Sequence, residues 1–119
     1  MARCRNCGPG AYPDSAFVHI TDGHAPYAQW KVEMVGEQVA FKSDNGKYLA
    51  RCHNCWKGGA YKDSAFIHVS HLHGNPWALW TPIEVGNYKW AFKADNGQFL
   101  ARCNHCVKGG AKPDSAFVH

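Results

Sequence analysis

The chain has 119 residues, of which 45% are hydrophobic and 18% charged, and its formal net charge is +4. This length and composition exclude a disordered protein and predict a single globular domain over residues 1–119. Lys and Arg are scattered singly along the chain, so nucleic acid is not an expected partner. The apolar runs are too short to span a bilayer, which predicts no membrane insertion.

The first motif in chain order is a cysteine-bearing segment that occurs three times. It reads CRNCGPGAYPDSAF at residues 4–17, CHNCWKGGAYKDSAF at 52–66 and CNHCVKGGAKPDSAF at 103–117. Each copy opens with a C-x-x-C pair and closes on a short alternating apolar run. Such alternation predicts a β-strand after each loop.

Two further segments repeat in step with the cysteine motif. APYAQWKVEMVG (25–36) matches NPWALWTPIEVG (75–86), and VAFKSDNGKYLARC (39–52) matches WAFKADNGQFLARC (90–103). Asn-Gly within the second pair of segments predicts tight hairpin turns, since Asn and Gly tolerate the backbone angles that such turns need. Apolar residues do not recur at helical spacing over a dozen positions, so an all-β fold is predicted.

The repeating unit is about fifty residues long and divides the chain into parts 1–37, 38–88 and 89–119. We expect these parts to contain three, four and three strands, ten in all. Trp30, Trp80 and Trp90 lie at alternating strand positions, which places all three in the predicted core.

The segments FKSDNGKYLAR and FKADNGQFLAR, with the Pro-aromatic-x-x-Trp strand that follows about thirty residues later, resemble the repeat of the fascin, hisactophilin and plant agglutinin (amaranthin-type) β-trefoils. The resemblance implies a β-trefoil-like fold and a binding role without catalysis, in families that include lectins and actin binders. A complete trefoil has twelve strands, so ten strands predict an incomplete one with unpaired edges. We expect a homo-oligomer, self-assembly or strand exchange to cover these edges, unless the molecule is an open relative of the trefoil.

The three C-x-x-C pairs allow several chemistries. The favoured interpretation is a local staple in each loop, formed by the disulfides Cys4–Cys7, Cys52–Cys55 and Cys103–Cys106. Zinc is the alternative, with Cys52, Cys55 and His68 as three ligands from one copy. Redox catalysis is disfavoured, because no predicted helix begins at these pairs to lower a thiol pKa. Free thiols in a reducing compartment are the remaining alternative.

The cellular compartment stays open at this point. Residues 1–7, MARCRNC, lack the apolar core of a secretory signal, which favours the cytoplasm and free thiols. Disulfides would instead favour an extracellular location.

The loops after the cysteine pairs carry aromatic residues and an aspartate that suit a shallow saccharide site. An aromatic face can stack on a sugar ring, and a carboxylate can accept hydrogen bonds from its hydroxyl groups. Trp56 and Trp77 are not required by the repeat and are further candidates for contact. The predicted ligand-binding residues are Tyr12, Asp14, Trp56, Tyr61, Asp63, Trp77 and Asp114. For the aspartates taken alone, a turn-capping role is favoured over the ligand role.

The segment HVSHLHG places His68, His71 and His73 near one another. They are candidates for one metal ion or one pH-sensitive contact, and the alternative is a set of solvated loop histidines.

These observations lead to a prediction of a non-enzymatic, lectin-like protein that binds glycans and needs no cofactor. The alternatives are a structural, self-assembling or actin-associated protein, and a zinc-binding protein that uses the C-x-x-C and His residues. An enzyme is not predicted, because the sequence has no nucleophile–base order, paired carboxylates, HExxH motif or phosphate loop.

Overall fold

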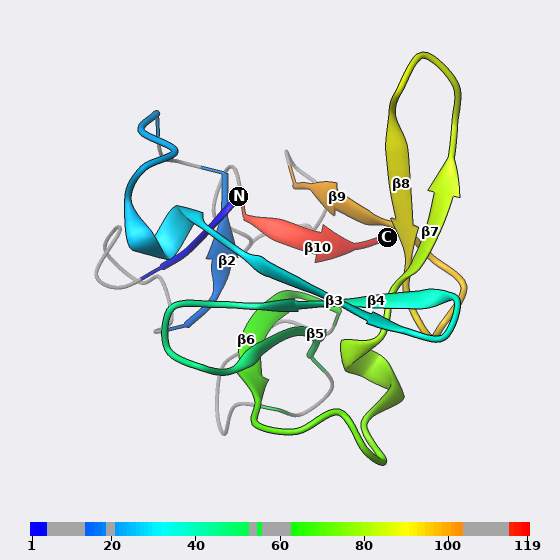
Figure 1. Cartoon of the computed structure of the whole chain (residues 1–119), viewed down its shortest axis with the longest axis horizontal. Coiled ribbons are helices and arrows are strands. Elements are labelled where there is room, and N and C mark those ends of the chain that lie inside the picture. The colour runs from blue at the N-terminus through cyan, green and yellow to red at the C-terminus, as the bar shows by residue number, and fades with distance from the viewer. Residues whose placement is uncertain (5–13, 19–20, 53–54, 56–62, 104–114) are drawn as a thin grey trace.

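The computed structural model describes residues 1–4, 14–18, 21–52, 55, 63–103 and 115–119. Within these residues the regular elements are ten strands and two short 3-10 helices, so the predicted all-β class is confirmed (Figure 1). The strands are β1 (Ala2–Arg3), β2 (Ala16–Phe17), β3 (Lys31–Val35), β4 (Gln38–Lys42), β5 (Tyr48–Arg51), β6 (Ala65–Val69), β7 (Thr81–Glu84), β8 (Trp90–Lys93), β9 (Leu100–Arg102) and β10 (Ala116–Val118). The helices are η1 (Pro26–Ala28) and η2 (Pro76–Ala78).

The strands form four small antiparallel sheets. One sheet has the order β3-β4-β5-β6, and the other three are the pairs β1-β2, β7-β8 and β9-β10. In the described residues, the predicted parts 1–37, 38–88 and 89–119 contain three, four and three strands, as expected from the repeat. None of the helices in the described part of the chain has the length and apolar character needed to cross a bilayer.

The strands at the ends of the three cysteine motifs join in a closed ring. The serine of each copy forms a β-bridge with the phenylalanine of the next: Ser15 with Phe66, Ser64 with Phe117, and Ser115 with Phe17. The ring brings β2, β6 and β10 together at the centre of the molecule (Figure 1), and their alanines are buried there. Three copies of one short sequence thus make three equivalent contacts around a pseudo-threefold axis.

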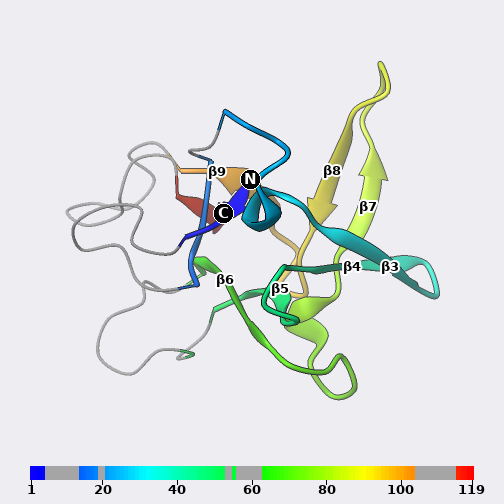
Figure 2. The ribbon, with the colours of Figure 1, turned by 60° about the vertical axis from the view of Figure 1, so that its left-hand side comes forward.

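Two longer hairpins, β3–β4 and β7–β8, extend from this ring on one side of the molecule (Figure 2). They are linked to each other by a pair of backbone hydrogen bonds between Val39 and Trp80, at 2.8 and 2.9 Å. The Trp80 indole donates a hydrogen bond to the carbonyl oxygen of Leu49 at 3.1 Å, and Trp30 donates in the same way to Met1 at 2.9 Å. Because Met1 and Leu49 occupy equivalent repeat positions, the two hairpins are attached to the body by the same contact.

The predicted Asn-Gly turns are present and nearly identical. Gly46 and Gly97 have positive φ angles of 80° and 85°, which a residue with a side chain rarely adopts. The asparagine before each glycine accepts a hydrogen bond from the backbone N–H two residues along, at 3.0 Å in both turns. This local side-chain bond is the Asx-turn chemistry that makes Asn-Gly a reliable turn signal.

The core prediction is correct for one of its three tryptophans. Trp80 is fully buried in the main apolar cluster with Val39, Leu49 and Ile67. Trp30 is only half-buried at the edge of that cluster, and Trp90 is exposed. Alternation along a strand tells which face a side chain lies on, but burial also requires a neighbouring element over that face.

A candidate binding groove beside the Cys52–Cys55 disulfide

The Cys52–Cys55 pair is a disulfide, with its Cα atoms 5.3 Å apart, so this staple is confirmed. Cys4 and Cys103 are also disulfide-bonded, whereas Cys7 and Cys106 lie outside the described residues. Since the thiols of Cys52 and Cys55 are consumed in this bond, the alternative zinc set of Cys52, Cys55 and His68 could form only after reduction. Zinc binding therefore remains a prediction for the reduced protein.

Behind the disulfide, Arg51 at the end of β5 binds two aspartates from different parts of the chain. Its Nη1 lies 2.8 Å from Asp63, and its Nε and Nη2 donate to both carboxylate oxygens of Asp95, each at 2.8 Å. Such two-pronged Arg–carboxylate contacts fix orientation as well as charge. Arg51 thus ties the disulfide hairpin to the Asn-Gly turn after β8.

Arg3 makes the same contacts in the preceding copy. It lies 2.9 Å from Asp14 and donates two hydrogen bonds of 2.7 Å to Asp44. The hydrogen bonds from Arg3 lower the pKa of Asp44 to about 2, and those from Arg51 lower the pKa of Asp95 in the same way. Each arginine thus binds two carboxylates from different parts of the chain. We call each set of one arginine and two aspartates an ionic clamp.

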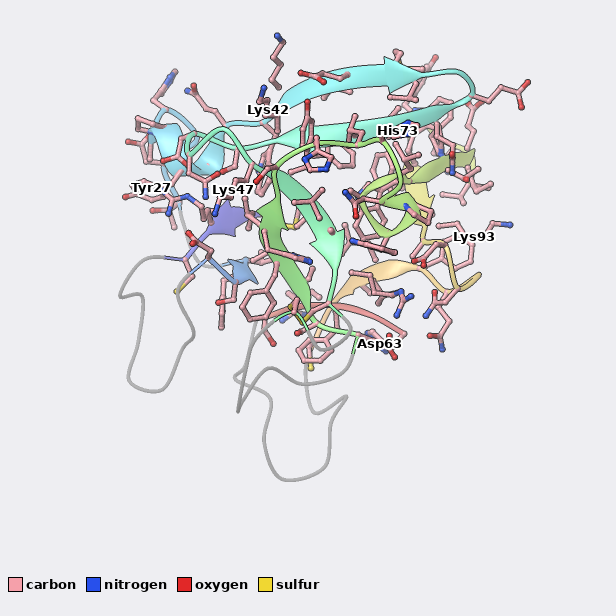
Figure 3. The ribbon with its side chains drawn as sticks, turned by 90° about the horizontal axis from the view of Figure 1, so that it is seen from below. Tyr27, Lys42, Lys47, Asp63, His73 and Lys93 are labelled. Carbon is pink, nitrogen blue, oxygen red and sulfur yellow. A yellow bond between two sulfur atoms is a disulfide. The ribbon has the colours of Figure 1, made fainter. Side chains whose placement is uncertain are left out.

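These clamps give Asp14 and Asp63 a structural role, through salt bridges with arginine that the sequence analysis did not predict. Both residues adopt positive φ angles, 65° and 67°, at the start of β2 and β6, and both carboxylates bind arginine. Figure 3 shows Asp63 at the end of the body remote from Lys42, beside the start of β6. The geometry favours these two aspartates as supports of the loops rather than as free ligand groups.

A groove of about 720 Å³ opens between the disulfide, β6 and the segment that leads to β7. Its lining residues are Arg51, Cys55, His68, Val69, Ser70, His71, Asn75, Pro76, Trp77 and Asp95. We call it the Trp77 groove. Its volume is within the range of roughly 300–1,000 Å³ that is common for small-molecule sites.

The sequence places Trp77 at this groove through the short helix η2. Pro76 starts the helix with its fixed φ, and the N–H of Leu79 closes the turn on the Pro76 carbonyl at 3.0 Å. The Asn75 side-chain amide donates a 2.8 Å hydrogen bond to the carbonyl oxygen of His71, which fixes the loop before the helix. Trp77 packs against the apolar cluster around Tyr48 and Val69, and it is half-buried there.

Two of the predicted histidines also line the groove. His68 is half-buried, and its Nδ1 lies 3.3 Å from the Phe66 carbonyl oxygen. Burial lowers the pKa of His68 below its ordinary value of 6.5, so the ring is neutral at pH 7. His71 is exposed, and His73 is exposed outside the lining. Among the described residues, no group of three His, Cys, Asp or Glu side chains is placed to hold a metal ion.

The outcome for the predicted ligand-binding residues is mixed. Trp77 lines the groove, Asp14 and Asp63 do not, and Tyr12, Trp56, Tyr61 and Asp114 lie outside the described residues. Sequence reasoning missed Arg51, Asn75 and Asp95 as groove residues. A signal was available for two of them, since Arg and Asp recur at fixed places in the LARC and DNG motifs.

Comparison with known proteins returns no family model and no curated protein that matches the chain. The chemistry of the groove must therefore be judged from its own residues. It offers one aromatic wall, two imidazoles and an amide, next to a carboxylate whose oxygens have lone pairs beyond those that Arg51 uses. This arrangement suits a small polar molecule with one apolar face.

Proposed function

We propose that the chain is a non-enzymatic binding module of the β-trefoil type that binds carbohydrate in the Trp77 groove. The closed ring of β2, β6 and β10 supports the trefoil-like arrangement, because three equivalent hairpins around one axis are its defining feature. The two Trp-bearing hairpins, attached by matching indole hydrogen bonds, support it as well.

The observation that carries the glycan proposal is the position of Trp77 on the wall of a groove that also contains several polar side chains. A pyranose ring has a face of C–H groups that can stack on an indole, and hydroxyl groups around its edge. Asn75, His71 and Asp95 supply both donors and acceptors within the same groove. A sugar could use the hydrogen-bonding capacity that these groups retain, whereas a purely apolar ligand could not, which favours a sugar.

The groove is also held in shape before a ligand arrives. The Cys52–Cys55 disulfide, the Arg51 clamp and helix η2 each restrain one wall. A pre-ordered site loses less conformational entropy on binding, so even a shallow groove can reach useful affinity. Tyr27, which is exposed, replaces the half-buried Trp77 at the same place in helix η1, and two weak sites would gain from avidity.

A glycan array followed by titration of the strongest hit tests this proposal. We expect Trp77→Ala to lower affinity at least tenfold, because loss of one stacking aromatic costs about 1.4 kcal/mol or more. Tyr88→Ala is the matched control, since Tyr88 is the most exposed aromatic in the described chain and lies outside the groove. Absence of any sugar-inhibitable signal, or equal affinity of both variants, would contradict the proposal.

A further inference from the structure

A second groove, of about 490 Å³, lies between the outer strands β3 and β8 and shares no lining residue with the Trp77 groove. Its lining is almost wholly apolar: Met1, Val18, Ala28, Trp30, Val32, Phe41, Phe92, Leu100, Ala101, Arg102 and Ala116. We call it the β3–β8 groove. An exposed apolar groove beside an unpaired strand edge is more often a site where another protein segment docks than a surface that faces water.

The repeat explains why this surface is uncovered. Three cysteine hairpins form the central ring, but the described residues supply two Trp-bearing hairpins around it, β3–β4 and β7–β8. The pseudo-threefold axis places a third such position between β8 and β3, where the groove lies. Figure 2 shows the two hairpins diverging from the body on the same side.

The backbone groups of β3 that face this position can be deduced from the register. Val39 bonds to Trp80 through both its N–H and its C=O, so its backbone groups point away from β3. Met34 lies opposite Val39 in a non-hydrogen-bonded pair. In such a pair the backbone N–H and C=O groups of both residues point away from each other, so those of Met34 point to the free edge of β3. Val32, two residues along, therefore also directs its N–H and C=O to the free edge. The side chains of Val32 and Met34 are 56% and 67% exposed.

The charges along β3 favour pairing with a second copy of the same strand in one register. If a second β3 strand pairs antiparallel with the first and is centred on Val32, Lys31 lies opposite Glu33 of the partner subunit, and Glu33 opposite Lys31 of the partner subunit. Opposite charges across a strand pair are favourable, whereas centring on Glu33 would place two glutamates face to face. The Glu33 carboxylate accepts a hydrogen bond of 2.7 Å from the Tyr48 hydroxyl of β5, across β4, so it must turn back toward the free edge of β3 to meet Lys31 of the partner subunit.

We propose that a second copy of this chain covers the β3–β8 groove, with β3 pairing against β3 of the partner subunit in a two-fold dimer centred on Val32. A two-fold axis requires each contact to be self-complementary, which the order Lys31, Val32, Glu33 satisfies. The pairing would bury Val32 and Met34 of both copies and bond their outward backbone groups. This inference is independent of the glycan proposal, because the Trp77 groove stays open.

The first test removes the outward backbone N–H of Val32 while leaving the pairing of β3 with β4 intact. In β7 the position equivalent to Val32 is Pro82, which pairs with Phe92 in an ordinary antiparallel register. Val32→Pro should therefore fold, while the outward N–H needed for the dimer is lost. In light scattering and sedimentation velocity, wild-type protein should show concentration-dependent doubling of its mass, and Val32→Pro should stay monomeric. A wild type that is monomeric at all accessible concentrations overturns the proposal.

The second test addresses the register through charge exchange. Lys31→Glu alone and Glu33→Lys alone should each be monomeric, because each homodimer would place like charges opposite one another. A mixture of the two single variants should form a heterodimer, and the double variant should dimerise with itself, since both restore opposite pairs. Far-ultraviolet circular dichroism checks that every variant is folded. If both single variants dimerise as the wild type does, the register is wrong and the proposal fails.

Discussion

The middle repeat and the uncovered side of β8 and of the segment after β2, which we call the rim, contain the same sequence positions in different surroundings. Val39 is 5% exposed, whereas Trp90, its equivalent on β8, is 54% exposed. Ile67 is fully buried, whereas Val18 at the matching place after β2 is 41% exposed. The residues at the rim are at least as apolar as those in the middle repeat. They are therefore exposed because no neighbouring strand covers them. The comparison teaches that burial in a repeat depends on the neighbouring copy.

The largest effect should come from the tryptophans that mark the two regions. Trp80→Ala should destabilise the fold by about 3–5 kcal/mol, because it leaves a cavity in the core. It also removes the indole hydrogen bond to Leu49. Trp90→Ala should cost less than about 1 kcal/mol in dilute protein, since its side chain is largely exposed. Urea denaturation below the dimerisation range measures both, and equal losses would mean that the rim is already covered within one chain.

A smaller effect should follow from opening one ionic clamp. Arg51→Met removes the partner of Asp63 and Asp95, and we expect a loss of about 1–3 kcal/mol because two charged groups lose their hydrogen bonds. Arg3→Met should cost a similar amount, since its contacts with Asp14 and Asp44 are copies of these. Lys31→Ala, which breaks an exposed pair, is the control and should have little measurable effect in protein dilute enough to be monomeric. A negligible loss in both arginine variants would show that the clamps do not stabilise the repeat.

The smallest expected effect is a pH dependence at the Trp77 groove. Burial lowers the pKa of His68, so below its ordinary pKa of 6.5 the unfolded chain binds a proton that the folded chain excludes. The contribution of His68 to stability should be complete above pH 6.5, decline as the pH falls further, and level off below its folded pKa. His68→Gln should therefore reduce the stability change between about pH 7.5 and pH 5. An unchanged pH profile in His68→Gln would contradict the burial assigned to this ring.

The fold was predictable from the sequence where the signal is local or repeated. The fifty-residue period predicted where the strands lie. Asn45 and Asn96 predicted the turns, because an asparagine side chain accepts a hydrogen bond from a backbone N–H of its own turn. The Cys52–Cys55 staple was predictable for the same reason, since its partners are three residues apart.

The groove was harder to predict because its walls come from separate parts of the chain. Arg51 and Asp95 are 44 residues apart, and only the folded ring brings them together. Asp63 was a candidate ligand group because its loop also carries an aromatic residue, with turn capping as the competing interpretation, but its carboxylate forms a salt bridge with Arg51. Trp90 was placed in the core because strand alternation identifies a face and carries no information on the element that covers it.

Nuclear magnetic resonance of the tryptophan indole N–H groups gives the most direct test of the glycan-binding groove. Trp77 lies on the wall of the groove, whereas Trp80 lies in the core and serves as an internal reference. Trp77→Ala and Trp80→Phe would assign the two signals. On addition of the best glycan, we expect the Trp77 signal to shift progressively to saturation while the Trp80 signal stays in place. A bound glycan that leaves the Trp77 signal unmoved would contradict the assignment of this groove as the binding site.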